Sequence, residues 1–369
     1  MTSQGGTRKD QHVDLARAQH VQGPARNDFD EVRFVHHALA GIDRDRVDVS
    51  TSFAGFQWSV PLYINGMTGG SVRTGEINRQ LAIAARETGV AIASGSMSIA
   101  LREPDTAATF RVLREENPDG FVLANLSADA TGEQALRAID LVRADALQIH
   151  LNSVQETVMP EGSRAFSAWP DRIAEIVDRV EVPVVVKEVG FGLSRTTLEQ
   201  LADLGVHVAD VSGQGGTDFA RIENARRAEN DYAFMAGWGQ SAASCLLDAQ
   251  AAVDGGSAIP ALLASGGVRT PLDVVRALAL GARAAGVSGT FLHSLLDEGL
   301  EGLIARIRAW IGQIEQLHAL LGAATPAGLV GTDLLLSGAV REFCDLRGID
   351  AAAYSRRSDR GLRDQEGRG

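Results

Sequence analysis

The strongest constraint on the fold is a repeated alternation of short apolar runs with segments that have the period of an α-helix. Eight such pairs follow one another, and the apolar runs are rich in valine, isoleucine, leucine and alanine. Strands of this composition are buried on both faces, which is typical of a parallel sheet. Eight successive strand–helix units predict an α/β fold, a (β/α)8 TIM barrel, rather than a doubly wound sheet.

The expected strands, each with the helix that follows it, are 60–66 with 74–87, 89–94 with 105–116, 121–125 with 131–142, 146–151 with 168–179, 182–188 with 194–204, 206–212 with 240–252, 259–265 with 271–279, and 282–288 with 291–321. We expect a single domain over residues 1–353, in which residues 1–59 form an N-terminal arm. The charged, glycine-rich segment 354–369 is expected to be a disordered tail. Two long loops, 151–167 and 213–238, follow strands and should lie at the carboxyl end of the barrel.

Composition narrows the range of partners. The chain has 35 basic and 47 acidic residues, a formal charge of −12, which disfavours general nucleic-acid binding. It has only Cys245 and Cys344, in no CxxC pair, so no zinc site or disulfide framework is indicated, although one bridge stays an alternative. We find no secretory signal and no apolar stretch of membrane-spanning length. We therefore expect a cytoplasmic protein with no membrane partner, and we expect a homo-oligomer.

Polar side chains and glycines follow every expected strand. They are Met67 to Gly70, Ser94 to Ser96, Asn125, His150 to Asn152, Lys187 and Glu188, Ser212 and Gly213, Ser265 to Gly267, and Ser288 and Gly289. In a barrel these positions converge on one mouth, where active sites are built. The alternative is that each serves only turn geometry or helix capping.

The segment 265–289 is the strongest local signal. Glycines let backbone N–H groups approach an anion, and barrels often bind phosphate after strands seven and eight. Ser265-Gly266-Gly267 follows strand seven, Gly281-Ala282 opens strand eight, and Arg269 adds a positive charge. A tight strand–helix turn is the alternative. A second glycine-rich loop, 210–223, contains Thr217 and could bind a phosphate or act as a lid.

The run HLNSVQE, residues 150–156, contains four side chains of ligand type. His150 and Asn152 share one face of an extended chain. Glu156 is a candidate Mg²⁺ ligand, because Mg²⁺ takes few protein carboxylates together with substrate phosphate oxygens. A solvated acid and a buried structural imidazole are the respective alternatives for Glu156 and His150.

Two further groups of basic residues are candidates for anion binding. Lys187 ends an apolar strand and needs an anionic or electron-rich partner. An ion pair with Glu188 is the alternative, although neighbouring strand residues face opposite sides. Arg8 and Lys9 lie in the polar arm, where simple solvation is the alternative.

Together these motifs resemble type II isopentenyl diphosphate isomerase. The resemblance covers about residues 8–345 and rests on Thr7 to His12, Met67 to Gly70, His150 to Glu156, Val186 to Gly190, Ser212 to Thr217 and Ser265 to Arg269. It implies a TIM barrel that binds FMN and Mg²⁺, uses NADPH to reduce the flavin, and interconverts isopentenyl and dimethylallyl diphosphate without net redox change. Reduced FMN would act as an acid–base cofactor.

The resemblance also implies roles for individual residues. FMN contacts fall on Gly66, Met67, Thr68, Ser96, Asn125, Lys187, Thr217, Gly266, Gly267, Arg269, Gly281 and Ala282. Contacts to the small-molecule diphosphate substrate fall on Arg8, Lys9, Ser96, His150 and Asn152. Gln155 lies beside the reacting carbons as the catalytic residue, and Glu156 binds Mg²⁺.

The chain departs from the family pattern in two places. Met97-Ser98 stands where many members have Gln-Arg, and residues 237–242 read GWGQSA where members often have DWGIPT. The main alternative function is an FMN-dependent 2-hydroxy acid dehydrogenase or oxidase, which shares the phosphate signature. Its base is usually a histidine after strand six, where this chain reads SGQGGT. A purine-nucleotide dehydrogenase would need a nucleophilic cysteine in the loop, and a non-enzymatic flavin or phosphate carrier would leave HLNSVQE without a role.

Overall fold

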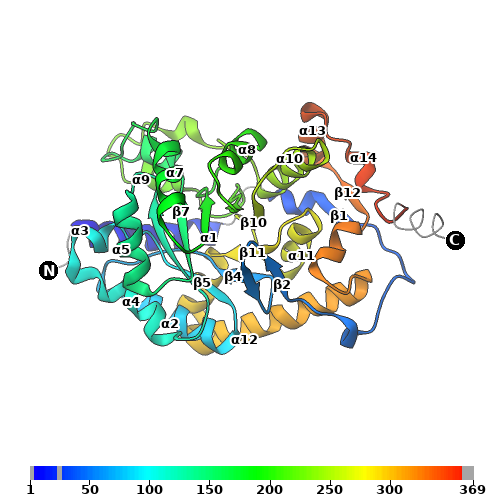
Figure 1. Cartoon of the computed structure of the whole chain (residues 1–369), viewed down its shortest axis with the longest axis horizontal. Helices are drawn as coiled ribbons and strands as arrows, with labels where there is room; N and C mark the ends of the chain where they lie inside the picture. The colour runs from blue at the N-terminus through cyan, green and yellow to red at the C-terminus, as the bar shows by residue number, and fades with distance from the viewer. Residues whose placement is uncertain (1–3, 23–26, 360–369) are drawn as a thin grey trace.

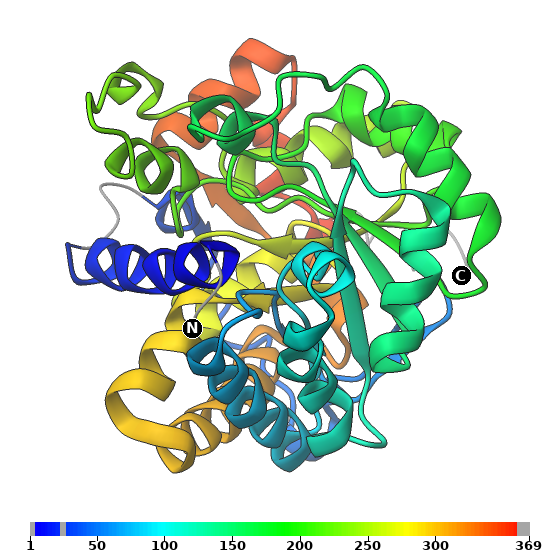
Figure 2. The same cartoon turned by 90° about the vertical axis from the view of Figure 1, so that its left-hand side faces the viewer.

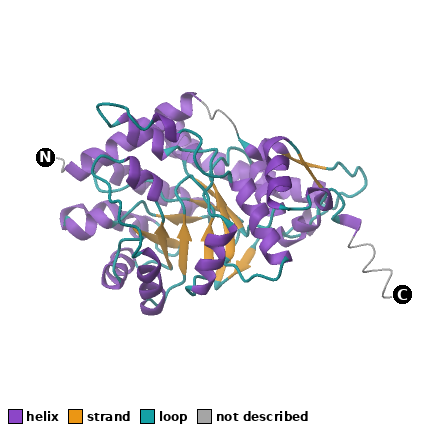
Figure 3. Ribbon diagram, turned by 90° about the horizontal axis from the view of Figure 1, so that it is seen from above, coloured by secondary structure: helices purple, strands orange, loops and turns teal. Residues whose placement is uncertain are grey.

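A computed structural model describes residues 4–22 and 27–359. Eight parallel strands close into a barrel in the spatial order β10-β11-β4-β5-β6-β7-β8-β9, with helices packed around it (Figures 1 and 3). The barrel strands are β4 (Leu62–Ile64), β5 (Ala91–Ala93), β6 (Val122–Ser127), β7 (Ala146–His150), β8 (Val184–Lys187), β9 (Val208–Asp210), β10 (Ala261–Ser265) and β11 (Ala284–Val287). The predicted (β/α)8 barrel is thus confirmed.

A long helix follows each barrel strand, in the expected order. These helices are α2 (Val72–Thr88), α4 (Ala108–Glu116), α5 (Gly132–Val142), α7 (Trp169–Arg179), α8 (Arg195–Asp203), α10 (Ala242–Asp254), α11 (Pro271–Ala279) and α12 (Gly289–Leu321). Serine and threonine begin many of them: Ser71 and Thr131 each form a capping box, and Ser241 and Thr270 accept a backbone N–H three residues on. Part of the polar character of the strand–helix loops therefore serves capping.

Shorter helices lie between these units. They are α3 (Ser98–Arg102), α6 (Ser153–Val158), α9 (Phe219–Ala225), α13 (Gly338–Arg347) and α14 (Ala351–Tyr354), with 3-10 turns η1 (Asp28–Glu31), η2 (Arg44–Arg46), η3 (Pro104–Thr106), η4 (Ala233–Met235) and η5 (Pro326–Gly331). The segments 151–167 and 213–238, expected as loops, therefore contain α6 and α9. The two helices pack against each other, which explains why such short segments are helical.

The amino end of the barrel is closed by aromatic side chains. The hairpin of β2 (Thr51–Phe53) and β3 (Phe56–Trp58) brings Phe53, Phe56 and Trp58 into mutual ring contact, and Trp58 also contacts Tyr63 inside the barrel. These rings belong to a buried apolar cluster with Leu123 and the inner residues of neighbouring strands. The plug leaves only the carboxyl end of the barrel open to ligands.

The N-terminal arm is mostly ordered around the barrel. Its helix α1 (Gln4–Gln22) contacts α2, α9 and α12, and Figure 2 shows it in dark blue between α12 and the light green segment that carries α9. Further along, β1 (Val32–Phe34) pairs antiparallel with β12 (Leu334–Leu336), which joins the arm to the end of the chain. No helix in the described ranges is both long and apolar enough to cross a membrane.

The start of the segment that we expected to be a tail is packed on the fold. Tyr354 is buried, Arg357 donates to the carbonyl of Ala279, and Ser358 hydrogen-bonds to Asp333. Residues 355–359 are therefore held by contacts that their charged sequence did not reveal. The rest of the expected tail, 360–369, lies outside the described residues.

Candidate active site

One cavity of about 970 Å³ opens at the carboxyl end of the barrel. Its volume lies in the range of sites that enclose a small-molecule ligand. Sixteen of the residues that the sequence assigned to a site line it: Arg8, Lys9, Gly66, Met67, Thr68, Ser96, Asn125, His150, Asn152, Gln155, Glu156, Lys187, Thr217, Gly266, Gly267 and Arg269. The cavity thus brings together residues from α1, from six strand ends and from two long connections.

Gly281 and Ala282 do not line this cavity, which corrects their expected contact with the flavin. Both precede β11, at the end of the strand opposite to the mouth. Ser288 and Gly289, which follow the same strand, do line the cavity. Phosphate-binding groups of a barrel belong at the carboxyl ends of its strands. Ser288 and Gly289 are therefore better placed than Gly281 and Ala282 for the expected contact with the flavin.

The glycine-rich loops after β9 and β10 lie against each other. A Cβ atom on Gly266, whose φ is +88°, would clash with the carbonyl of Gly213, and Gly215 and Gly216 pack directly on Gly267. Only glycine permits this approach. Nearby, the hydroxyl oxygens of Thr68 and Ser94 are buried without a hydrogen-bond partner. Open backbone and unpaired hydroxyl groups fit a cofactor that carries a phosphate and polar ring edges, as FMN does.

Arg269 also lines the cavity, but its guanidinium group is already paired. It lies 2.6 Å from Asp30 and 3.4 Å from Asp273, so two carboxylates share the charge that the sequence assigned to a phosphate. The backbone N–H of Arg269 donates to Asp273 at 3.1 Å.

Lys187 is buried at the end of β8. Its Nζ donates to the backbone carbonyl of Glu188 at 2.5 Å, whereas the Glu188 carboxylate accepts the N–H groups of Val189, Gly190 and Phe191. Lys187 is therefore not paired with the Glu188 side chain. Burial lowers the pKa of Lys187, while Asp210, its neighbour in register on β9, raises it. Such a lysine suits the edge of an electron-rich ring.

A chain of buried hydrogen bonds leads from the barrel interior to His150. Asn125 donates to Gln148 at 2.8 Å, and its oxygen lies 2.8 Å from Nδ1 of His150. Burial, then Lys187 and Lys9, lower the pKa of His150 to about 3. His150 is thus a neutral imidazole in a cationic surrounding, and an arriving anion would favour its protonation.

Helix α1 brings two cations to the mouth. Arg8 and Lys9 both line the cavity. Burial and the neighbouring Arg8 lower the pKa of Lys9 to about 8. The arm therefore contributes positive charge to the cavity of an acidic protein, as anion binding requires.

Glu156, on α6, lies beside an unused oxygen atom. Its carboxylate accepts Nδ2 of Asn152 at 3.0 Å and the N–H of Ser163 at 2.8 Å, while Oδ1 of Asn152 is buried without a partner. No group of three or more metal-ligating side chains is found within residues 4–22 and 27–359. This set fits a Mg²⁺ ion that takes most of its ligands from a diphosphate and water.

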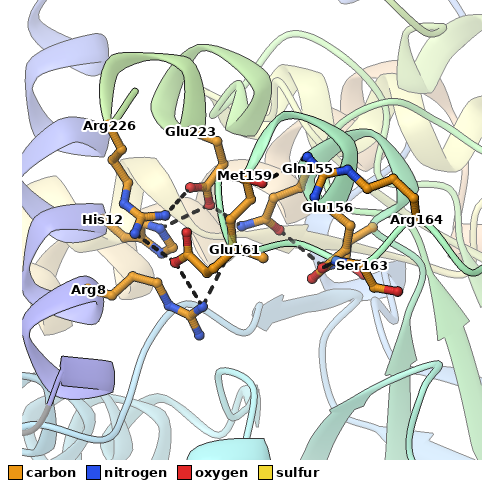
Figure 4. Close-up of polar contacts among 11 residues, drawn as sticks. Arg8, His12, Gln155, Glu156, Met159, Glu161, Ser163, Arg164, Glu223 and Arg226 are labelled. Carbon is orange, nitrogen blue, oxygen red and sulfur yellow. Dashed lines mark hydrogen bonds and ion pairs between the residues drawn. The ribbon is translucent and has the colours of Figure 1, made fainter. Parts of the chain in front are cut away.

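Gln155 is held by residues that sequence reasoning did not assign to the site. Its Nε2 donates to Oε1 of Glu223 at 2.7 Å, and the same oxygen lies 3.1 Å from Nε2 of His12 (Figure 4). Arg226 pairs with the other oxygen of Glu223. Burial alone would raise the pKa of Glu223, but its bonds to His12, Gln155 and Arg226 together lower it to about 2. His12 is the last residue of the RKDQH motif, so the motif could have identified it as a site residue. No sequence motif pointed to Glu223.

The two departures from the family pattern have different surroundings. Met97 is fully buried, and Ser98 contacts Ser96 through their hydroxyl groups at 3.3 Å. The second departure brings the half-exposed Trp238 to the rim of the cavity, and the carbonyl of Gln240 accepts the N–H of Gln214.

Neither cysteine is suited to covalent catalysis. Cys245 and Cys344 are free and buried. Burial raises the pKa of both thiols, to about 11 for Cys344 and higher for Cys245. A thiol with a raised pKa is a poor nucleophile, so chemistry at this cavity depends on other groups.

The fold and the site define a flavin-binding barrel protein. The family model for FMN-dependent dehydrogenases matches residues 99–335. Among solved structures, a mutant flavocytochrome b2 with benzoylformate aligns with a TM-score of 0.63 at 19% identity, covering 86% of this chain and 77% of that one. A mandelate oxidase mutant with the monooxide FMN adduct aligns with a TM-score of 0.60 at 19% identity, covering 89% of this chain and 92% of that one. At such identities the likeness concerns the fold.

Relatives that match over nearly the full length identify the family more narrowly than the fold does. The isopentenyl-diphosphate delta-isomerase of Kitasatospora griseola is 62% identical over 351 residues, 95% of each chain. The enzyme of that name from Nocardia farcinica is 60% identical, and the match covers 95% of this chain and 96% of the relative. The one from Staphylococcus haemolyticus is 44% identical, and the match covers 93% of this chain and 97% of the relative. This chain belongs to the isopentenyl-diphosphate delta-isomerase family, in its FMN-dependent form.

Proposed function

We propose that this protein interconverts isopentenyl diphosphate and dimethylallyl diphosphate, with reduced FMN and Mg²⁺ in the cavity and NADPH as the reductant of the flavin. The observation that carries the proposal is a single cavity with two chemically different parts. Its lining includes glycine loops and unpaired hydroxyl groups, which fit a flavin, and also Arg8, Lys9 and His150, which fit a diphosphate. A flavin and a diphosphate can therefore bind next to each other.

The difficult step is protonation of an unactivated alkene, which creates positive charge on carbon. Bound in its reduced form, FMN supplies a proton donor and an electron-rich ring. Lys187 would lie at the ring edge and stabilise its negative charge. No described cysteine is reactive, so the protein's own contribution is orientation, electrostatics and the second proton.

The diphosphate end is bound by the arm and the loop after β7. Arg8 and Lys9 of α1, with His150 and Asn152, would clamp the phosphate oxygens, and Glu156 would hold Mg²⁺ against them. This fixes the alkene in a reactive position, and α1 lying across the rim excludes water.

Gln155 and Glu223 would handle the proton at C2. An amide is a poor base, but Gln155 donates to the ionised, buried Glu223 at 2.7 Å. That carboxylate orients the Gln155 amide and is the nearest described base behind it. A carboxylate whose pKa is lowered to about 2 is a poor proton acceptor, so we assign proton transfer at C2 to Gln155 and give Glu223 the role of orienting its amide.

The 2-hydroxy acid dehydrogenase alternative lacks its base. In that chemistry a histidine after the sixth strand removes a proton from the substrate hydroxyl. Here Ser212 to Thr217 follow β9 without a histidine, and they line the cavity. Three described histidines line the cavity. His12 and His150 are engaged with Glu223 and Asn125, and His293 lies on α12, after the eighth barrel strand and not the sixth.

The deciding experiment is an anaerobic assay with purified protein, FMN, NADPH, Mg²⁺ and isopentenyl diphosphate. We expect dimethylallyl diphosphate as product and no oxidation of lactate or mandelate in a parallel assay. Formation of a 2-oxo acid without any alkene isomerisation would favour the dehydrogenase alternative.

The metal assignment has its own test. Substituting Glu156→Gln should weaken the Mg²⁺ dependence and raise the substrate KM, because the amide loses the charge that holds the ion. FMN content, read from flavin absorbance, should stay unchanged, and EDTA should reproduce the kinetic defect in the unmodified protein. Full activity in EDTA would remove Glu156 and the metal from the site.

A homo-oligomeric state and a cytoplasmic location are also part of this proposal. Both cysteines are free thiols, which supports a reducing compartment. Size-exclusion chromatography with light scattering would measure the assembly state.

A further inference from the structure

A continuous chain of charged contacts joins the arm to Gln155. Arg8 on α1 contacts Glu161 at 3.4 Å, Glu161 contacts Arg226 at 2.8 Å, and Arg226 pairs with Glu223, which holds Gln155 (Figure 4). The signs of the charges alternate along the chain. Glu161 and Arg226 are the members with no part in the proposed reaction, and of these only Glu161 contacts Arg8.

The two contacts of Glu161 differ in strength. Both use Oε1 of Glu161, whose side chain is 45% exposed, but the contact with Arg226 is 2.8 Å long and that with Arg8 is 3.4 Å long, and Arg8 is the more exposed of the two arginines, at 26% against 15%. A long, partly solvated ion pair is weak. Arg8 is also incompletely satisfied, because its Nε is buried without a hydrogen-bond partner and its Nη1 otherwise reaches only the sulfur of Met159.

We propose that Glu161 is a positioning residue that holds Arg8 at the mouth in the free protein and competes with the substrate diphosphate for it. The inference rests on the proposed function, in which Arg8 binds the diphosphate. A diphosphate carries more charge than one carboxylate and offers several oxygens to the unsatisfied guanidinium. It therefore displaces Glu161 from Arg8, while Glu161 keeps its shorter bond to Arg226.

This arrangement has two consequences. In the absence of substrate, the pair keeps the Arg8 guanidinium at the mouth, so this side chain needs little ordering when substrate arrives. The competition also lowers the affinity for any anion that cannot displace a carboxylate. Glu161 thus favours a highly charged diphosphate over weaker anions.

The test measures binding of inorganic pyrophosphate to the FMN-loaded protein by titration calorimetry with Mg²⁺ present. Substituting Glu161→Gln removes the competing charge but keeps an oxygen that accepts from Arg226. We expect pyrophosphate to bind about three- to fivefold tighter, the range for a partly exposed ion pair, with a lower KM and a kcat within about twofold of the unmodified protein.

A double-mutant cycle separates competition from a general effect of charge. In the Arg8→Ala background, Glu161→Gln should give no gain in pyrophosphate affinity. The matched control is Asp297→Asn, because Asp297 pairs with Arg17 on the same helix at 2.7 Å. That substitution also removes one negative charge and one anchor of α1, and it should leave the affinity within about twofold.

Three results would overturn the inference: unchanged or weaker pyrophosphate binding in Glu161→Gln, a gain that persists without Arg8, or an equal gain in Asp297→Asn. The proposed function fails in a different way. A protein that binds pyrophosphate with these dependences but does not isomerise the alkene would reject the function and keep the competition.

Discussion

In the proposed reaction Gln155 is an unusual proton-transfer group, because its amide depends on a partner that orients it. Glu223 is that partner, fully buried and ionised. Substituting Gln155→Ala should lower kcat by on the order of 10²-fold with little change in KM, since the lost interaction is made in the transition state. Steady-state kinetics at constant flavin content would measure it.

Isotope exchange distinguishes chemistry from positioning at the same residue. In deuterated solvent, exchange at C4 should survive the Gln155→Ala change better than exchange at C2, because we assign the proton added at C4 to the reduced flavin and that lost from C2 to the Gln155 side. Glu223→Gln should reproduce the loss at C2. If both exchanges fall equally in Gln155→Ala, the residue only positions substrate.

Lys9 makes diphosphate binding depend on pH. Its pKa is lowered to about 8 by burial and by Arg8, so the protonated form that attracts phosphate is lost as pH rises through that value. We expect the Kd for pyrophosphate to increase above about pH 8 in the free protein. Substituting Lys9→Arg keeps the side chain charged, so the rise of the Kd should move to higher pH. A rise at the same pH in this variant would assign the titration to another group.

The site residues that sequence reasoning identified lie on motifs next to strand ends, where the fold itself dictates convergence. Glu223, on α9, and Glu161, in the connection after α6, escaped notice because they lie outside the strand ends and act only through tertiary contacts. Gly281 and Ala282 were misplaced for a simple reason: they precede β11 instead of following it. Which end of a strand a motif occupies decides whether it can reach the mouth.

We expect substrate binding to depend strongly on helix α1, which carries Arg8 and Lys9. It lies outside the barrel, and its residues reach the cavity only because it packs against α2, α9 and α12. A double substitution, Arg8→Ala with Lys9→Ala, should raise KM and lower kcat/KM by on the order of tenfold or more, since charge-assisted phosphate contacts are strong. FMN affinity, measured by fluorescence titration, should change much less. Unchanged kinetics would indicate that the two side chains are solvated and do not contact the substrate.

The long elements were predictable because each repeats one pattern: an apolar run buried on both faces, then an amphipathic helix. The short helices α6 and α9 were not, because segments of six and seven residues form no stable helix alone. They are helical because they pack on each other above the mouth. The same contacts bring Gln155 and Glu223 together, so the missed elements and the missed catalytic partner have one cause.

The distribution of charge over the molecule supports a local anion site within an acidic protein. The formal charge is −12, yet Arg8, Lys9 and Lys187 all face one cavity. Carboxylates such as Glu156 and Glu161 line the cavity as well, so the expected attraction for a diphosphate comes from this local group of cations. Raising the ionic strength should therefore weaken pyrophosphate binding, and it should do so less in the Arg8→Ala, Lys9→Ala protein.

The reaction as a whole conserves the oxidation level of the substrate, which constrains how NADPH is used. If the flavin acts as an acid–base cofactor, it must leave each turnover in the reduced state in which it entered. We expect anaerobic NADPH oxidation, followed at 340 nm, to stop after about one equivalent per flavin while product continues to form. Flavin reduced by dithionite should support turnover without NADPH. NADPH consumption that matches product formation throughout would contradict the isomerase mechanism and identify an oxidoreductase.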